Sequence, residues 1–174
     1  MRTPIWVLAA IVTVWAGAFP AAQAGSARLP PVLSALLGDW NGRGTVSGRP
    51  ATVAMTWSLE LAGRFVHLRF RNEMAPTATR PIEVLESHGY YRAASPDATG
   101  GVGTWIDSRG VILPLSLTLS GNTLTSDWGS ESTERGRTTY VLLGPDRLEV
   151  TDLVRLPDGQ YRPFGQTNLS RTPR

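Results

Sequence analysis

The 174-residue sequence contains no cysteine and only two histidines, His67 and His88. Without cysteine the fold has no disulfide bond, so the backbone hydrogen bonds and the hydrophobic core must stabilise it. Tight zinc sites are built from several cysteine and histidine ligands. Two histidines that stand well apart in the sequence, with no cysteine to join them, argue against such a site.

Lysine is absent as well, so all 17 lysine-plus-arginine positions are arginines. The formal net charge is only +3, because acidic residues are interspersed among the arginines along the whole chain. Proteins that bind nucleic acids usually gather their positive charge in a patch or a stripe. The even distribution of charge therefore predicts that no nucleic acid is a partner.

The common catalytic and nucleotide-binding motifs are missing too. The sequence has no Gly-x-Ser-x-Gly, no phosphate-binding loop and no His-Glu-x-x-His. Gly42 and Gly44 precede a strand-like stretch rather than a helix, so they do not form a dinucleotide-binding fingerprint. Because no residues form a catalytic constellation, the leading hypothesis is a protein without enzymatic activity.

The first 24 residues have the features of a secretory signal peptide. Arg2 supplies a positive charge, residues 5–19 are apolar, and Ala22 and Ala24 frame a small-x-small cleavage site. The apolar stretch is shorter than a comfortable membrane span. We therefore expect one domain at residues 25–174, located in the periplasm or secreted, with no membrane span after cleavage.

Most of this domain has the two-residue alternation that is typical of β-strands. Residues 51–61, for example, alternate apolar side chains such as Val53 and Trp57 with small polar ones. Turn signals such as Gly121-Asn122 separate successive stretches at regular spacing. Ten strands are predicted, at residues 39–46, 51–61, 64–72, 81–92, 101–106, 111–119, 123–128, 137–143, 147–156 and 160–171.

Ten short strands joined by tight turns predict an all-β fold, a single antiparallel up-and-down β-barrel of about ten strands. Closing the sheet into a barrel removes its exposed edges. Residues 32–37 are the exception to the strand pattern. They follow Pro30 and Pro31 and end at Gly38, which predicts a short helix that plugs one end of the barrel.

The first predicted strand begins within residues 37–44, Leu-Gly-Asp-Trp-Asn-Gly-Arg-Gly. This run resembles the Gly-x-Trp start of lipocalin-type barrels and the Gly-x-Trp-x-Gly-x-Gly start of nitrobindin-like barrels, ten-stranded relatives of the fatty-acid-binding fold. Residues 105–110, 127–128 and 164–171 are similar to exported bacterial lipocalin-like domains of unknown function. The resemblance implies a barrel that binds a small molecule in its lumen.

Nitrobindin-like barrels ligate haem through a histidine near the start of the last strand. Residues 162–169, at the matching place in this sequence, contain no histidine, and His67 and His88 lie on early strands. The resemblance therefore implies the barrel without the haem, and no cofactor is expected. It also implies a structural contact in which Arg171, on the last strand, lies over the indole of Trp40 at the closed end.

Arg69 and Arg71 are candidate ligand-binding residues with two opposite interpretations. Fatty-acid-binding barrels hold anionic head groups with inward arginines, so the resemblance places both side chains in the lumen. The alternation instead assigns the apolar face to Val66, Leu68 and Phe70, which places the arginines in solvent beside acidic side chains. The sequence leaves both interpretations open.

His88 and Tyr90 share a strand face and could orient a ligand or move a proton, because histidine titrates near neutral pH. The alternative is a structural histidine that is solvated or bonded to the backbone. Trp105 and Trp128 are candidates for the aromatic wall of a cavity, although core packing is the default interpretation for both. Asp107 is expected to cap a type I turn, with a site at the rim of the barrel as the alternative.

The leading hypothesis is an exported barrel, a monomer or a homodimer, that binds a small hydrophobic or amphipathic ligand in its lumen. A second hypothesis is an interaction module of the cell envelope with a packed interior. A third is an isomerase or hydrolase that uses His88 in the lumen. It requires His88 to face a cavity with a carboxylate within hydrogen-bond reach.

Overall fold

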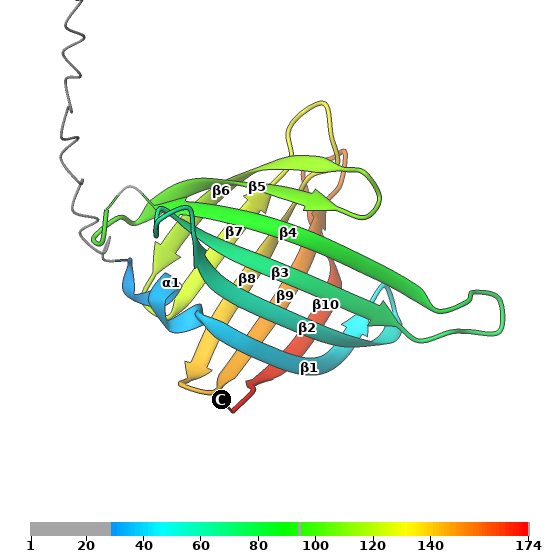
Figure 1. Cartoon of the computed structure of the whole chain (residues 1–174). Coiled ribbons are helices and arrows are strands. Elements are labelled where there is room, and N and C mark those ends of the chain that lie inside the picture. Colours follow the sequence, from blue (N-terminus) through cyan, green and yellow to red (C-terminus); the bar gives the residue numbers. More distant parts are fainter. Residues whose placement is uncertain (1–28, 94, 174) are drawn as a thin grey trace, which may run out of the picture.

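The computed structural model describes residues 29–93 and 95–173 (Figure 1). The predicted signal peptide, residues 1–24, lies outside these residues. The described chain begins with one short helix, α1 (Pro31–Leu36), and continues with ten strands. The strands are β1 (Gly38–Val46), β2 (Arg49–Glu60), β3 (Phe65–Met74), β4 (Glu83–Ala93), β5 (Gly100–Asp107), β6 (Ile112–Ser120), β7 (Thr123–Trp128), β8 (Gly136–Gly144), β9 (Arg147–Arg155) and β10 (Tyr161–Arg171).

The strands form one closed barrel in which every strand pairs antiparallel with its neighbours in sequence. The barrel closes where β1 pairs with β10, from Trp40 opposite Arg171 to Val46 opposite Gly165. The predicted up-and-down barrel of ten strands is thus confirmed. The strand expected from residue 81 begins later, at Glu83, because the carbonyl oxygen of Pro81 accepts a hydrogen bond from the Arg49 guanidinium at 2.6 Å.

Two glycines of β1 let the barrel close tightly at this seam. A Cβ atom at Gly42 would clash with the carbonyl oxygen of Asn168, and one at Gly44 would clash with that of Gln166. Glycine in a strand often marks such a close backbone approach. β1 can therefore lie this close to β10 only because both positions lack a side chain.

One end of the barrel is sealed by α1, which lies across it in Figure 1. Leu33 and Leu36 of this helix are fully buried, as is Trp40 at the start of β1. The indole Nε1 of Trp40 donates a hydrogen bond to the carbonyl oxygen of Leu36 at 2.8 Å. The expected contact with the last strand is present, since the Arg171 guanidinium lies 4.1 Å from the centroid of the Trp40 ring.

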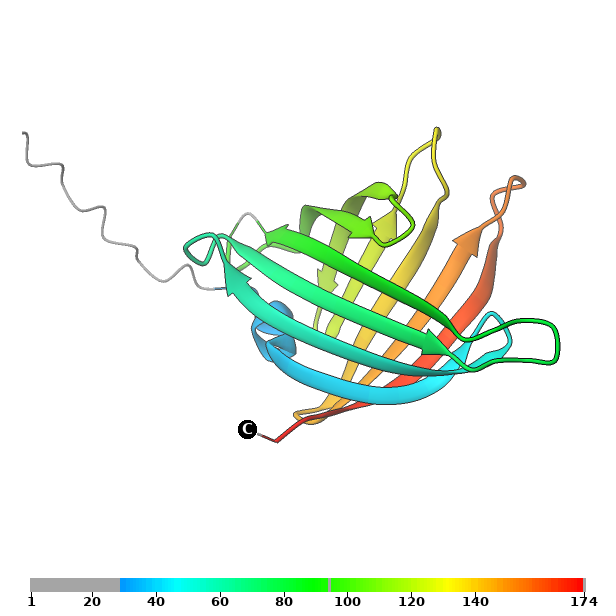
Figure 2. The same ribbon diagram turned by 45° about the vertical axis from the view of Figure 1, so that its right-hand side comes forward.

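The opposite end of the barrel carries the longer loops, including residues 75–82, 129–135 and 156–160 (Figure 2). Arg49 is buried at this end and holds the first of these loops. Its guanidinium donates to the carbonyl oxygen of Ala75 at 2.7 Å and pairs with Glu83 at 2.8 Å. We call this end of the barrel the mouth.

Among the described residues, no helix has the length and the apolar character needed to cross a membrane.

Candidate functional site

The lumen contains a cavity of about 400 Å³ that extends from the core to the mouth. Its walls are mainly apolar and include Val53, Met55, Leu113, Leu115 and Val150, which come from strands all around the barrel. These side chains point inward because alternate residues of a strand face opposite sides of the sheet. The cavity lies within the range of volume, roughly 300–1,000 Å³, that is typical of small-molecule sites.

Trp105 and Trp128, the candidates for an aromatic wall, both line this cavity. The Trp105 ring packs against Phe70 with 5.7 Å between centroids, and its Nε1 donates to Asp107 Oδ2 at 3.1 Å. Trp128 Nε1 donates to Thr138 Oγ1 at 3.3 Å. Both indoles are therefore held in place by wall residues. Their role in ligand binding stays a prediction.

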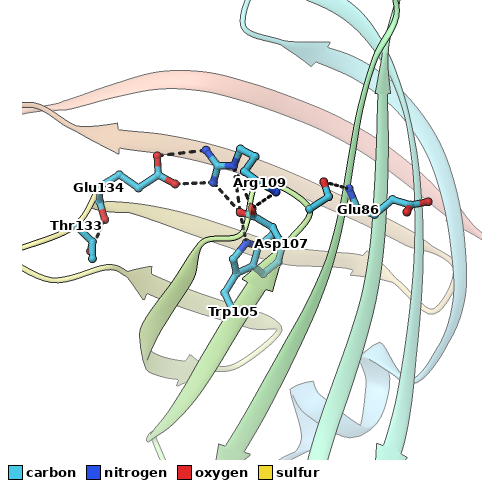
Figure 3. Close-up of polar contacts among 7 residues, drawn as sticks. Glu86, Trp105, Asp107, Arg109, Thr133 and Glu134 are labelled. Carbon is cyan, nitrogen blue, oxygen red and sulfur yellow. Dashed lines mark hydrogen bonds and ion pairs between the residues drawn. The ribbon is translucent and has the colours of Figure 1, made fainter.

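An ion-paired cluster of Asp107, Arg109 and Glu134 stands at the mouth (Figure 3). The Asp107 side chain is fully buried and accepts hydrogen bonds from the Arg109 backbone N–H at 2.9 Å and from Arg109 Nη2 at 2.7 Å. The first of these is the turn cap that the sequence predicted. Figure 3 shows the Arg109 guanidinium reaching across to Glu134, with which it pairs at 2.5 Å.

The charge of this cluster is fixed by its own contacts. Burial alone would raise the pKa of Asp107, but hydrogen bonds from Arg109 and Trp105 outweigh burial and hold the pKa below its usual value. Hydrogen bonds to Asp107 and Glu134 raise the pKa of Arg109. The cluster is thus a charged group at the edge of the cavity in which each carboxylate already contacts a guanidinium.

Deeper in the barrel, three polar side chains form a row across neighbouring strands. Ser126 on β7 is paired in register with Thr138 on β8, which is paired with Asp152 on β9, and all three line the cavity. Thr138 Oγ1 donates to Asp152 Oδ1 at 2.7 Å. Burial raises the pKa of Asp152, and the hydrogen bond from Thr138 opposes that shift only in part. We call these three residues the lumenal polar row.

Two further polar groups line the cavity. The hydroxyls of Tyr91 and Tyr140 lie 3.5 Å apart, and burial raises the pKa of both phenols. The Oδ1 atom of Asn72 and the Oγ atom of Ser126 are buried without a hydrogen-bond partner in the described part of the chain. Unpaired buried polar atoms are uncommon in folded proteins. Of the four such atoms in the described part of the chain, Asn72 Oδ1 and Ser126 Oγ belong to residues that line the cavity, whereas Trp57 Nε1 and Ser87 Oγ do not.

Four of the predicted ligand-binding residues do not line the cavity. The structure places Arg69, Arg71, His88 and Tyr90 on the outside of the barrel wall, where Arg69 is opposite His88 in the register. The alternation explains this correction, because Val66, Leu68 and Phe70 occupy the inward phase of β3. The solvent-side interpretation of the two arginines therefore holds.

Their contacts agree with an outer location. Arg71 pairs with Glu73 at 2.8 Å on the surface. His88 Nδ1 lies 2.8 Å from Nε2 of His67, and the His67 ring stacks on Tyr90 with 4.6 Å between centroids. His67 is buried by these neighbours, although it lies outside the barrel. Burial lowers the pKa of His67, and His88 adds to this effect.

The placement of the histidines decides whether a histidine-held haem fits. Both histidines of the sequence are on β3 and β4 and face outward. The cavity near the start of β10 is lined by Arg162 and Phe164 instead. No imidazole is therefore available to a haem in the lumen, and a haem bound in the nitrobindin manner does not fit. That the protein has no cofactor of any kind stays a prediction.

Asp152 and Ser126 were not among the predicted site residues, although the pattern of each residue's strand contains a signal for it. Asp152 occupies the same alternation phase as Leu148 and Val150, and Ser126 the same phase as Leu124 and Trp128. A carboxylate or hydroxyl in the inward phase of an otherwise apolar strand indicates a polar group in the lumen. That signal could have identified both residues.

No family model matches the sequence, and the search among curated proteins finds no match. Among solved structures, the fold is similar to Rv2717c from M. tuberculosis, with a TM-score of 0.59 at 16% identity over 83% of this chain and 99% of that one. It is also similar to the S-type phycobiliprotein lyase CPES from Guillardia theta, with a TM-score of 0.54 at 6% identity over 82% of this chain and 90% of that one. At these identities the likeness shows a shared lipocalin-like barrel fold.

Proposed function

We propose that this protein binds a small hydrophobic or amphipathic molecule in the lumen of its barrel, outside the cytoplasm. The observation that carries the proposal is the cavity of about 400 Å³, which α1 seals at one end and the mouth leaves open at the other. Mainly apolar walls with a few fixed polar groups are typical of small-molecule sites. The predicted signal peptide at residues 1–24 supports export.

The two alternative functions have less support. An interaction module with a packed interior needs a lumen that side chains fill, and here a cavity of ligand size is present. A lumenal enzyme that uses His88 needs this histidine inside the barrel. His88 is exposed on the outer wall, and its hydrogen-bond partner is His67 rather than a carboxylate.

Fluorescence of Trp105 and Trp128 provides a test, since both indoles line the cavity. Purified mature protein is titrated with decanol, below the solubility limit of this alcohol, and tryptophan emission is recorded. We expect a saturable change in emission. In the cavity-filling variant Ser126→Phe the affinity should fall by about tenfold or more. The matched variant Ser116→Phe changes an exposed serine on the outer face of β6 and should bind like the wild type.

Circular dichroism shows whether each variant is folded before it is titrated. Native mass spectrometry of protein purified directly from its host adds a second readout, because a bound molecule appears as an added mass. No saturable response in the wild type, or equal affinity in Ser126→Phe and Ser116→Phe, contradicts binding in the lumen.

A further inference from the structure

The acidic side chains around the cavity differ in whether they form an ion pair with an arginine. At the mouth, Glu83 pairs with Arg49 at 2.8 Å. Asp107 and Glu134 both pair with Arg109, at 2.7 and 2.5 Å. Each of these carboxylates therefore contacts an arginine of the protein, with Arg109 shared between Asp107 and Glu134.

Asp152 is the exception within residues 29–93 and 95–173. No arginine or histidine lies within ion-pair distance of it, and its one hydrogen bond comes from Thr138 to Oδ1. Its inward neighbours on β9 are Val150 and Val154, which are apolar. A carboxylate in apolar surroundings is unfavourable unless a positive charge or hydrogen-bond donors approach it.

The space around Asp152 is also shaped by its neighbours. Gly165 stands opposite it on β10, and a Cβ atom there would come within 2.7 Å of Asp152 Oδ2. The glycine thus leaves room for the Asp152 carboxylate, which a larger side chain at position 165 would displace. On the other side of the row, Ser126 lines the same cavity, but its Oγ atom is buried and has no partner in the described chain. Asp152 Oδ2, which accepts no hydrogen bond within the described residues, is therefore the acceptor that a ligand in the cavity can contact.

From this arrangement we infer the class of ligand: an apolar molecule with a protonated amine, whose ammonium group pairs with Asp152 and whose hydrocarbon part fills the cavity. The inference rests on the proposed function and makes it more specific. An ammonium group has three donors and no acceptor. It matches the unpaired acceptor Asp152 Oδ2, and charge-assisted hydrogen bonds of this kind are among the stronger ones.

The arginines give little support to the opposite class, a fatty acid or another anion. Arg69 and Arg71 are on the outer wall, and Arg109 is already shared between two carboxylates. Arg162 lines the mouth and is exposed to solvent. It could meet an anionic head group only at the mouth, whereas Asp152 lies deeper, so the two classes predict opposite effects of substitution at Asp152 and Arg162.

Three probes with the same hydrocarbon chain separate these classes: decylamine and decanoate, each below its critical micelle concentration at pH 7, and decanol below its solubility limit. Binding is measured by isothermal titration calorimetry and by tryptophan fluorescence. We expect the wild type to bind decylamine at least about tenfold more tightly than decanol, and decanoate more weakly than decanol.

In Asp152→Asn the preference for the amine over the alcohol should disappear, while decanol still binds. The matched variant Glu149→Gln removes a carboxylate from the outer face of the same strand and should keep the preference. Arg162→Gln removes a positive charge from the cavity lining and should therefore not weaken amine binding. Thermal melting shows whether each variant is folded.

The outcomes distinguish a failure of the amine assignment from a failure of lumenal binding. If decanol binds but decylamine binds no tighter, or if Asp152→Asn keeps the preference, the amine assignment is wrong and lumenal binding stands. If decanoate binds best and Arg162→Gln abolishes this binding, the ligand is an anion. If no probe binds the wild type, the proposed function is contradicted, and the amine assignment with it.

Discussion

The guanidinium carbon of Arg171 lies 4.1 Å from the centroid of the Trp40 ring, which joins the last strand of the barrel to the first. The same guanidinium donates hydrogen bonds to the carbonyl oxygens of Leu37 at 2.5 Å and Ala35 at 2.7 Å. These two carbonyls belong to α1 and the residue after it. One side chain therefore holds the seam of the barrel and the helix that seals its end.

Replacing Arg171 by alanine should lower the free energy of unfolding by about 2–4 kcal/mol, because the cation–π contact and the hydrogen bonds to α1 are lost together. Chemical denaturation of the wild type and the variant measures this change. Arg147→Ala is the matched control, since Arg147 is an exposed arginine at the start of β9. Its effect should stay within about 0.5 kcal/mol. Equal effects in the two variants would show that Arg171 is not a closing contact.

The close approach of β1 and β10 predicts that Gly42 does not tolerate a side chain. Gly42→Ala should destabilise the fold by about 1–3 kcal/mol, because the new Cβ atom meets the carbonyl oxygen of Asn168 and the strands must separate. Gly144→Ala is the control, as a Cβ atom at Gly144 meets no atom within 4 Å. Thermal melting of both variants measures the difference. Equal melting temperatures would contradict the close seam.

The cluster at the mouth should stabilise the protein in a pH-dependent manner. The pKa of Asp107 is held below its ordinary value of 3.8, so the stabilisation is present above this pH and is lost as the pH falls through the lower, folded-state pKa. Asp107→Asn should therefore lower the free energy of unfolding by about 2 kcal/mol at pH 7 and by much less in strong acid. Urea denaturation of the wild type and the variant, at pH 7 and in acid, measures this difference.

Asp127→Asn is the comparison for that experiment. Asp127 pairs with Arg137 at 2.7 Å, but more than a third of each side chain is exposed. Solvent weakens such pairs, and we expect a cost below about 1 kcal/mol. If the two variants lose the same stability at pH 7, the buried cluster at the mouth has no special role in the fold.

Asp152 should show the opposite pH dependence, because burial raises its pKa. Stability linked to this group is fully present below the ordinary value of 3.8 and is lost as the pH rises through the higher, folded-state pKa. In ligand-free protein, Asp152→Asn should therefore be about 1–2 kcal/mol more stable than the wild type at pH 7, with no gain near pH 3. A variant that is less stable at pH 7 would contradict an uncompensated carboxylate in the lumen.

The architecture followed from the sequence because it depends on alternation and turn chemistry, which are local. In β2, Val53, Met55 and Trp57 alternate with polar residues, and the structure buries all three. At the end of this strand the alternation placed Leu59 in the same apolar phase, but the structure exposes its side chain. Leu59 lies beyond Trp57, the last residue of β2 that pairs with β1, and alternation alone does not reveal where that pairing ends.

The candidate site followed from the sequence only in part. Trp105 and Trp128, for which core packing was the default interpretation, line the cavity in the structure, and their role in ligand binding stays a prediction. The orientation of Arg69 and Arg71 was left open, because the resemblance placed both side chains in the lumen and the alternation placed them in solvent. The structure agrees with the alternation. The row that contains Asp152 depends on the register between β7, β8 and β9, which no single strand encodes.

The central claim is that a small apolar molecule binds inside the barrel, and intermolecular nuclear Overhauser effects test it most directly. The wild type is mixed with decanol, and contacts between the probe and assigned side-chain protons, including those of the indoles, are recorded. Binding in the lumen predicts contacts to Trp105 and Trp128, which line the cavity, and none to Trp40, which α1 seals off. Contacts confined to outer-wall residues such as His88 and Ile106, or no contacts at all, would contradict the account.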